Sequence, residues 1–112
     1  MKFGLLFEMQ RPYEGNDVDW NALYRETLDQ CELADQVGFD NLWFVEHHFL
    51  TEWAHSSASE VMLAVLSQHT TKMRLGFGVV LLPVHHPLHV AVKASTLDIM
   101  SGGRVDVGVG RS

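Results

Sequence analysis

The chain has 112 residues, 46% of them hydrophobic and 20% charged, with a formal net charge of −6 at pH 7. This composition argues for one small folded domain and against disorder, and the negative charge argues against nucleic acid or an anionic membrane as partner. The single cysteine, Cys31, excludes an intramolecular disulfide framework and favours a cytoplasmic location. No apolar stretch approaches the roughly 18 to 20 residues of a membrane helix.

Strands and helices are predicted to alternate along the chain. Short apolar or alternating runs predict strands, and apolar residues at helical spacing predict helices. The expected strands are 2–9, 41–46, 74–82 and 104–110, and the expected helices are 20–37, 59–70 and 87–100. Asp17 or Asp19 can cap the first helix, which Gly38 can end. The candidate caps of the second helix are Ser56, Ser57 and Ser59.

The order β-α-β-α-β-α-β predicts a parallel α/β sheet with right-handed crossovers. Two architectures satisfy it: an open doubly wound sheet and the amino-terminal half of a (β/α)8 TIM barrel. Open sheets that bind dinucleotides usually carry a glycine-rich turn after the first strand, whereas here the turn has only Gly15. A complete barrel needs about 250 residues, so the second architecture would make residues 1–112 a truncated barrel domain, which we would expect to be weakly stable, self-associating or part of a longer chain.

Functional residues of parallel α/β folds lie just past the carboxyl ends of the strands. The polar side chains expected on that rim are Glu8, Glu46, His47, His48, His85, His86 and Arg111. Neighbours in a strand point to opposite faces, so either His47 or His48 can face the barrel mouth and act as an acid or base near neutral pH. A histidine that only packs is the competing interpretation.

One glycine-rich stretch lies within the third strand and another lies at the end of the fourth. Gly76 and Gly78 allow either a ligand or packed side chains to approach the backbone closely. The stretch 108–112, Gly-Val-Gly-Arg-Ser, can receive a phosphate at Arg111, although it resembles no P-loop, and an arginine that is only solvated is the competing interpretation. The tract from His85 to His89 matches no standard zinc ligand spacing, so loop histidines ahead of a helix are the simpler interpretation.

Four motifs in order resemble one family. They are Glu46-His47-His48-Phe49 followed by Thr51-Glu52, the stretch 75–83 followed by His86-Pro87, the stretch 96–104, and Gly108-Val109-Gly110-Arg111. Together they resemble the luciferase-like flavin-dependent monooxygenases. The resemblance implies a (β/α)8 barrel with an insertion that uses reduced flavin (FMN) and O2 to oxidise a small organic substrate, or a deazaflavin coenzyme to move hydride.

The resemblance also implies roles for single residues and a set of partners. His47 matches the catalytic histidine, Arg111 lies where members hold the flavin phosphate, and Gly78-Val79 falls at a non-prolyl cis peptide under the flavin ring. Apolar rim residues would exclude water, namely Phe7, Phe49, Val79 and Leu81. The expected partners are a small-molecule substrate, O2, a separate flavin reductase and further copies of the chain, with no metal.

Two alternatives of other classes stay open at this point. One is a metal-dependent hydrolase barrel that uses His47, His85 and Glu8 as its polar centre. The other is a non-catalytic remnant that keeps half of the fold without binding a cofactor.

Overall fold

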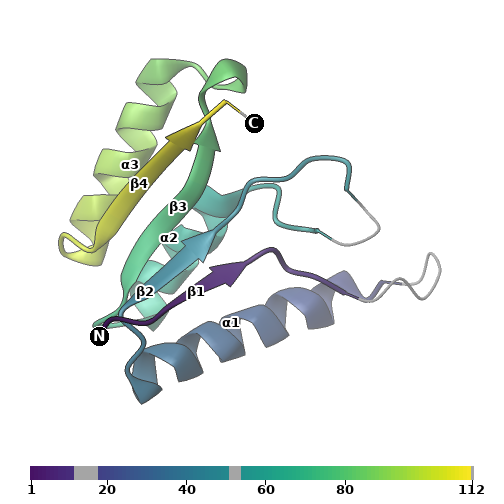
Figure 1. Cartoon of the computed structure of the whole chain (residues 1–112), viewed down its shortest axis with the longest axis vertical. Helices are drawn as coiled ribbons and strands as arrows, with labels where there is room; N and C mark the ends of the chain where they lie inside the picture. Colours follow the sequence, from purple (N-terminus) through teal and green to yellow (C-terminus); the bar gives the residue numbers. More distant parts are fainter. Residues whose placement is uncertain (12–17, 51–53, 112) are drawn as a thin grey trace.

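The computed structural model describes residues 1–11, 18–50 and 54–111, so the candidate cap Asp17 and the motif residues Thr51 and Glu52 lie outside the described residues. Within these ranges a parallel four-stranded sheet has the strand order β1-β2-β3-β4, so each strand pairs with its neighbour in sequence (Figure 1). The elements are β1 (Gly4–Phe7), α1 (Trp20–Val37), β2 (Asn41–Phe44), α2 (Ser59–His69), β3 (Arg74–Leu81), the 3-10 helix η1 (Leu82–Val84), α3 (Pro87–Ser101) and β4 (Val105–Gly110). This order confirms the predicted β-α-β-α-β-α-β arrangement.

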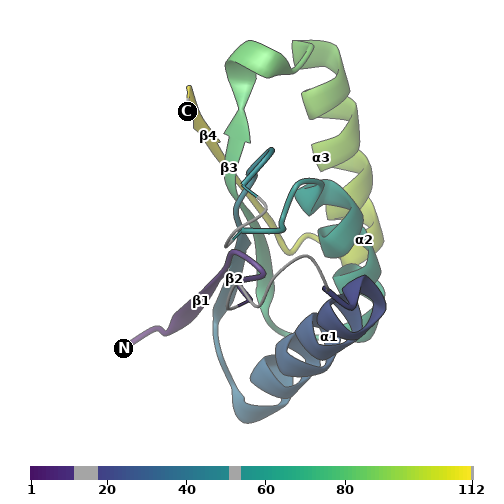
Figure 2. The same cartoon turned by 90° about the vertical axis from the view of Figure 1, so that its right-hand side faces the viewer.

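The helices α1, α2 and α3 lie on one face of the sheet, and the other face carries no helix among the described residues (Figure 2). Side chains alternate between the two faces, as the strand period requires. Leu42, Phe44 and Leu75 point to the helices and are fully buried. The register row that contains Leu6, Trp43 and Gly76 lies on the helix-free face, where Leu6 stays 63% exposed.

The core lies between the sheet and its helices. Its fully buried side chains include Leu63 and Leu66 of α2 and Met73 just before β3. Cys31 of α1 is also fully buried, and burial, followed by the nearby charge of Glu32, raises the pKa of its thiol to about 12. The cysteine is therefore a small core residue and not a reactive thiol.

Most of the predicted helix ends are confirmed. Asp19 caps α1 by accepting a hydrogen bond from the Ala22 N–H at 3.0 Å, and Gly38 ends α1 with φ +94°. The serine cap predicted for α2 is wrong: the N-cap residue is Ala58, with no side-chain hydrogen bond. The hydroxyl of Ser56 instead donates to the Val45 carbonyl at 2.8 Å, which fastens the segment before α2 to the end of β2.

The strands are shorter than predicted at several ends. β1 stops at Phe7, and Met9 takes a left-handed conformation with φ +54°. β2 stops at Phe44, although the Val45 N–H still donates to the Phe7 carbonyl at 3.1 Å. β3 departs from regular pairing between Phe77 and Val80, around a cis peptide bond that joins Gly78 to Val79.

Charged side chains fasten the amino ends of the strands. Asp35 of α1 accepts hydrogen bonds from three consecutive backbone N–H groups, those of Thr71, Lys72 and Met73, and from the Thr71 hydroxyl. Burial raises the pKa of Asp35, but these donors outweigh it and hold the pKa below its ordinary value. The carboxylate thus joins the end of α1 to the start of β3.

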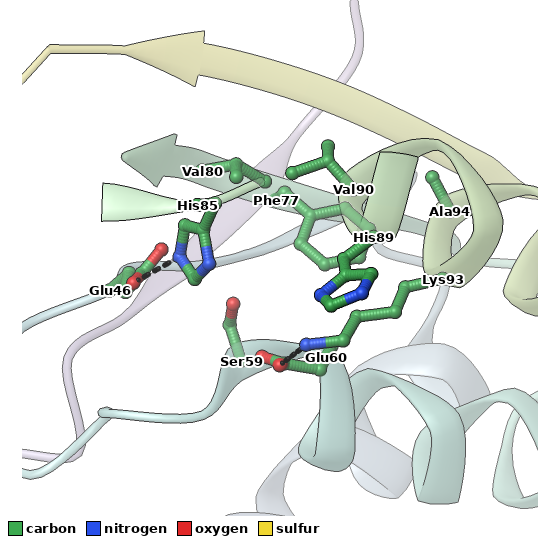
Figure 3. A pocket seen from close by; sticks show the side chains of 10 residues that line it. All are labelled: Glu46, Ser59, Glu60, Phe77, Val80, His85, His89, Val90, Lys93 and Ala94. Carbon is green, nitrogen blue, oxygen red and sulfur yellow. Dashed lines mark hydrogen bonds and ion pairs between the residues drawn. The ribbon is translucent and has the colours of Figure 1, made fainter. Parts of the chain in front are cut away.

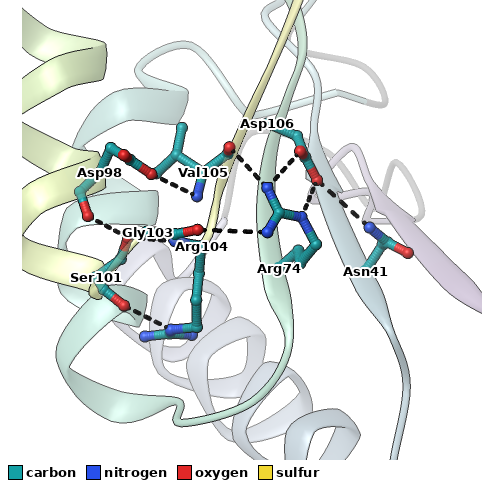
Figure 4. A network of polar contacts seen from close by, with 8 residues as sticks. All are labelled: Asn41, Arg74, Asp98, Ser101, Gly103, Arg104, Val105 and Asp106. Carbon is teal, nitrogen blue, oxygen red and sulfur yellow. Dashed lines mark hydrogen bonds and ion pairs between the residues drawn. The ribbon is translucent and has the colours of Figure 1, made fainter.

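Two arginines make further polar contacts at this end of the sheet (Figure 4). Arg74 makes a two-pronged contact with Asp106, at 2.8 and 2.6 Å, which joins β3 to β4. Arg104 donates to the carbonyls of Ser67, Thr70, Met73 and Ser101 and to the Thr70 hydroxyl. The amino end of the sheet is therefore closed by structural ion pairs and caps, while the carboxyl end is open.

In the described ranges, no helix combines the length and the apolar character that crossing a membrane would require.

Candidate functional site

An open pocket of about 470 Å³ lies at the carboxyl ends of β2 and β3. The residues that line it are Val45, Glu46, His47, His48, Leu50, Gly78, Val79 and Leu81. Three of the four predicted site residues, His47, Gly78 and Val79, therefore line one pocket. Apolar side chains supply much of the remaining wall, as is usual for small-molecule sites.

The glycines around this pocket allow strands and side chains to approach closely. A Cβ atom on Gly76 would collide with the Trp43 ring, and one on Gly108 would come within 2.6 Å of the Phe77 carbonyl oxygen. A Cβ atom on Gly110 would come within 2.8 Å of Val79. At these positions close packing is the reason for glycine. Gly78 is less crowded, because a Cβ atom there would lie 3.3 Å from Trp43, and it supplies the first half of the cis peptide.

His47 belongs to the wall of the pocket and is half-buried. Its backbone N–H donates to the Ser56 carbonyl at 2.8 Å, which joins the end of β2 to the segment that leads into α2. The cis peptide expected between Gly78 and Val79 is present on the neighbouring strand. A role for these residues toward a flavin stays a prediction.

Glu46, just past the end of β2, forms a buried polar contact. The residue is 7% exposed, and its carboxylate accepts from His48 Nε2 at 2.9 Å and His85 Nε2 at 2.6 Å on the same oxygen, Oε1. Its other oxygen accepts from the Leu81 N–H at 3.2 Å. Burial raises the pKa of Glu46, but the hydrogen bonds from His48, His85 and Leu81 outweigh it and hold the pKa below its ordinary value. Glu46 therefore points into the protein and binds both imidazoles.

A second, much smaller cavity lies behind this carboxylate, between α2, α3 and β3 (Figure 3). Its volume of about 20 Å³ is room for roughly one water molecule. Glu46 and His85 face it from one side, and the ion pair between Lys93 and Glu60, at 2.7 Å, closes the other. Among the described residues, Glu46 alone lines both this cavity and the larger pocket.

Arg111 directly follows β4 and is exposed. It is not among the side chains that line the larger pocket, so the structure does not bring it together with His47. Two of the apolar rim residues, Val79 and Leu81, do line the pocket. The other two do not: Phe7 stacks on Phe44 with ring centroids 5.4 Å apart, and Phe49 is fully exposed with φ +60°.

The polar centre expected of a metal hydrolase is not assembled. His85 binds Glu46, whereas the carboxylate of Glu8 accepts from Gln10 at 2.6 Å. Within the parts of the chain that the structure describes, no group of three His, Cys, Asp or Glu side chains could hold a metal ion. In the histidine tract, His86 caps α3 by accepting from the Leu88 N–H at 3.2 Å, which agrees with a role ahead of a helix.

The whole chain, residues 1–112, matches the family model of luciferase-like monooxygenases. It is 44% identical over 89 residues to 4-hydroxyprotoasukamycin monooxygenase of Streptomyces nodosus subsp. asukaensis, an alignment that covers 80% of this chain and 24% of the relative. It is 33% identical over 111 residues to the oxygenase component of the flavin-dependent trigonelline monooxygenase of Acinetobacter baylyi, covering 99% of this chain and 30% of the relative.

Solved structures agree with the sequence matches. The monooxygenase RslO1 of Streptomyces bottropensis superposes with a TM-score of 0.88 at 38% identity, over 100% of this chain and 33% of that one. The oxygenating constituent of 3,6-diketocamphane monooxygenase of Pseudomonas putida, solved with FMN, gives 0.88 at 25% identity, over 100% and 30%. An F420-dependent secondary alcohol dehydrogenase gives 0.75 at 24% identity, over 97% and 31%, which shows a shared fold alone.

The chain therefore belongs to the luciferase-like monooxygenase family. Its parallel four-stranded sheet is the amino-terminal half of a (β/α)8 barrel, as predicted. The chain spans about a quarter to a third of the length of these relatives.

Proposed function

We infer that the protein is a flavin-dependent monooxygenase that uses reduced FMN and O2 to oxidise a small organic substrate. This chain supplies the amino-terminal half of its single barrel domain. The observation that carries the inference is the pocket of about 470 Å³ that brings His47, Gly78 and Val79 together at the carboxyl ends of β2 and β3, in a chain of this family.

The residues of the pocket fit a flavin ring. An isoalloxazine ring is flat and aromatic, and the pocket offers it the backbone of Gly78 and Val79 with the apolar side chains of Leu50 and Leu81. When bound, reduced FMN supplies the electrons that activate O2. The apolar side chains exclude water from that chemistry, and His47 holds or moves a proton at its imidazole.

Arg111 is the group proposed for the FMN phosphate. It follows a strand whose alternate residues are Gly108 and Gly110, so it stands on backbone with little side-chain bulk. A guanidinium is always charged at neutral pH and pairs with phosphate oxygens through two N–H groups. The exposed position of Arg111 is compatible with a phosphate at the outer end of the flavin.

Further partners follow from the proposed reaction. An oxygenase that receives reduced flavin from outside needs a separate flavin reductase, and one relative of this chain is named an oxygenase component. We also propose a cytoplasmic homo-oligomer. A deazaflavin coenzyme is the alternative cofactor, favoured by the fold shared with F420-dependent enzymes, although those neighbours are less similar in sequence than RslO1.

Arg111→Ala tests the cofactor and its phosphate together. We expect the protein encoded by the gene to bind FMN. We expect the substitution to lower the affinity for FMN by about tenfold or more, since a hydrogen-bonded charge contributes roughly 1.5–3 kcal/mol. The affinity for riboflavin, which lacks the phosphate, should change little. The measurement is titration of FMN, riboflavin and a deazaflavin coenzyme by flavin fluorescence.

The matched control is Lys72→Ala, which removes one positive charge from the loop before β3, at the opposite end of the sheet. It should leave the affinity for FMN unchanged. Equal weakening of FMN and riboflavin by Arg111→Ala contradicts the phosphate assignment. If the protein binds the deazaflavin coenzyme in preference to FMN, the cofactor assignment changes to a deazaflavin. If it binds no flavin, the proposed function is overturned.

A further inference from the structure

We propose that Glu46 is a positioning residue that holds the His48 ring in a single tautomer and so makes His48 a second acid–base group of the pocket, beside His47. The part of this proposal that concerns the flavin pocket rests on the proposed function. The part that concerns the tautomer rests only on the geometry of Glu46, His48 and His85.

The hydrogen bonds fix which ring nitrogens carry protons. Both His48 and His85 present Nε2 to the same oxygen of Glu46, at 2.9 and 2.6 Å. An ionised carboxylate only accepts, so each Nε2 must donate. In a neutral imidazole the other nitrogen, Nδ1, is then an acceptor. His48 therefore has a basic nitrogen available on the side of the ring away from Glu46.

A purely structural role does not explain the partners of Glu46. Asp35 shows what such a role looks like in this fold, because its donors are backbone N–H groups and a threonine hydroxyl, none of which titrates near neutral pH. Glu46 has a single backbone donor among the described residues, Leu81, and two imidazoles. A buried carboxylate that holds a histidine ring is the arrangement that orients acid–base histidines in enzymes.

The exposure of the three side chains gives them different tasks. The Glu46 side chain is 5% exposed, His85 is 26% exposed and His48 is 42% exposed. His85 approaches the carboxylate from the side of the small cavity and fixes it there (Figure 3). His48 lines the larger pocket together with Gly78 and Val79. The ring that Glu46 orients is thus the one open to a ligand.

Nitrogen NMR of the imidazole rings tests the tautomer directly. The sample is the protein encoded by the gene, labelled with ¹⁵N in histidine, at about pH 8.5, where an ordinary imidazole is neutral. His48→Gln and His85→Gln assign the two sets of signals. We expect the Nε2–H tautomer to exceed the other by about tenfold or more at His48 and at His85, because the acceptor is charged. This result needs no substitution at Glu46.

Glu46→Gln then removes the charge at nearly constant size. We expect it to reduce the tautomer preference of His48 and His85 to about threefold or less, because an uncharged acceptor forms weaker hydrogen bonds. The matched control is Glu32→Gln, which removes the carboxylate that contacts His69 on the outer surface. It should change the ring signals of His69 and leave those of His48 unchanged.

The outcomes separate this proposal from the proposed function. A wild-type His48 ring that is mainly Nδ1–H, or a tautomer ratio that Glu46→Gln leaves unchanged, overturns the positioning role. If Glu46→Gln fails to fold, the tautomer ratio of His48 in the wild-type protein alone decides whether the positioning role stands. Addition of FMN should shift the His48 signals and not those of His69. If FMN binds without that shift, His48 has no role toward FMN and that part of the proposal is overturned. If FMN does not bind, the proposed function is rejected, while the tautomer result still stands.

Discussion

At the scale of single side chains, the pocket contains two adjacent histidines with different surroundings. His47 is half-buried in the wall of the pocket, and His48 is exposed and held by Glu46. Both residues line the pocket, so the two rings can act on different atoms of one ligand. Loss of either ring therefore has its own expected effect.

His47→Ala should leave FMN binding intact and lower turnover by about 10²- to 10⁴-fold, the usual contribution of a positioned acid or base. The measurement is kcat with a reductase supplying reduced FMN, alongside the FMN affinity. His69→Ala, which removes a histidine from the outer surface, is the control and should not change kcat. Unchanged turnover in His47→Ala would falsify the acid–base role of this residue.

The sequence identified the residues of the pocket better than their interactions. A strand ending in Glu46-His47-His48 and a strand containing Gly78-Val79 predict a shared rim, because parallel strands end at the same edge, and the pocket confirms this. The contact of Glu46 with His85 joins residues 39 positions apart. It depends on how η1 turns back after β3 and brings His85 to the carboxylate, which is a tertiary contact.

At the scale of elements, Asp35 holds α1 to the start of β3. Its pKa is lowered in the folded protein, so its contribution to stability is fully present above the ordinary value of 3.8 and is lost as the pH falls through the lower folded value. Asp35→Asn should reduce the free energy of unfolding by about 1–3 kcal/mol at pH 7. Its difference from wild type should shrink below about pH 4.

Urea denaturation between pH 7 and pH 3 measures both effects. Asp29→Asn, an exposed carboxylate on the same helix, is the control and should change the free energy of unfolding by less than about 0.5 kcal/mol. A difference between wild type and Asp35→Asn that stays constant down to pH 3 would show that the carboxylate charge is not what joins α1 to β3.

The elements themselves were well predicted where a local residue sets the boundary. Asp19 begins α1 because its side chain accepts a hydrogen bond from a backbone N–H, and Gly38 ends α1 because it takes a left-handed conformation. Boundaries set by tertiary contacts were not predicted. Ser56 was expected to cap α2, but its hydroxyl binds the Val45 carbonyl, and that partner is known only once β2 and α2 are packed together.

At the scale of the whole molecule, the sheet has a covered face and an uncovered one (Figure 2). The edge strand β1 presents Leu6, 63% exposed, on the uncovered face. An exposed apolar edge strand promotes pairing with other chains, so we expect the polypeptide of residues 1–112 to self-associate. Sedimentation velocity over a range of concentrations measures this.

Leu6→Lys should lower that self-association, because a charge on an exposed edge strand opposes pairing with another chain. Leu33→Lys, on the outer surface of α1, is the control and should have a smaller effect. A monodisperse wild-type monomer with a sharp cooperative melt would contradict the prediction.

The arginine and carboxylate network at the amino end of the sheet has a consequence for engineering the pocket at the opposite end. Arg104 and Arg74 fasten α2, β3 and β4 to one another at the end opposite the pocket. Substitutions around Leu50 and Leu81 therefore reshape the pocket without loosening those joints. Most members of a library of variants confined to the pocket wall should therefore still fold. The carboxyl end of the sheet, where the pocket lies, is a practical starting point for directed evolution.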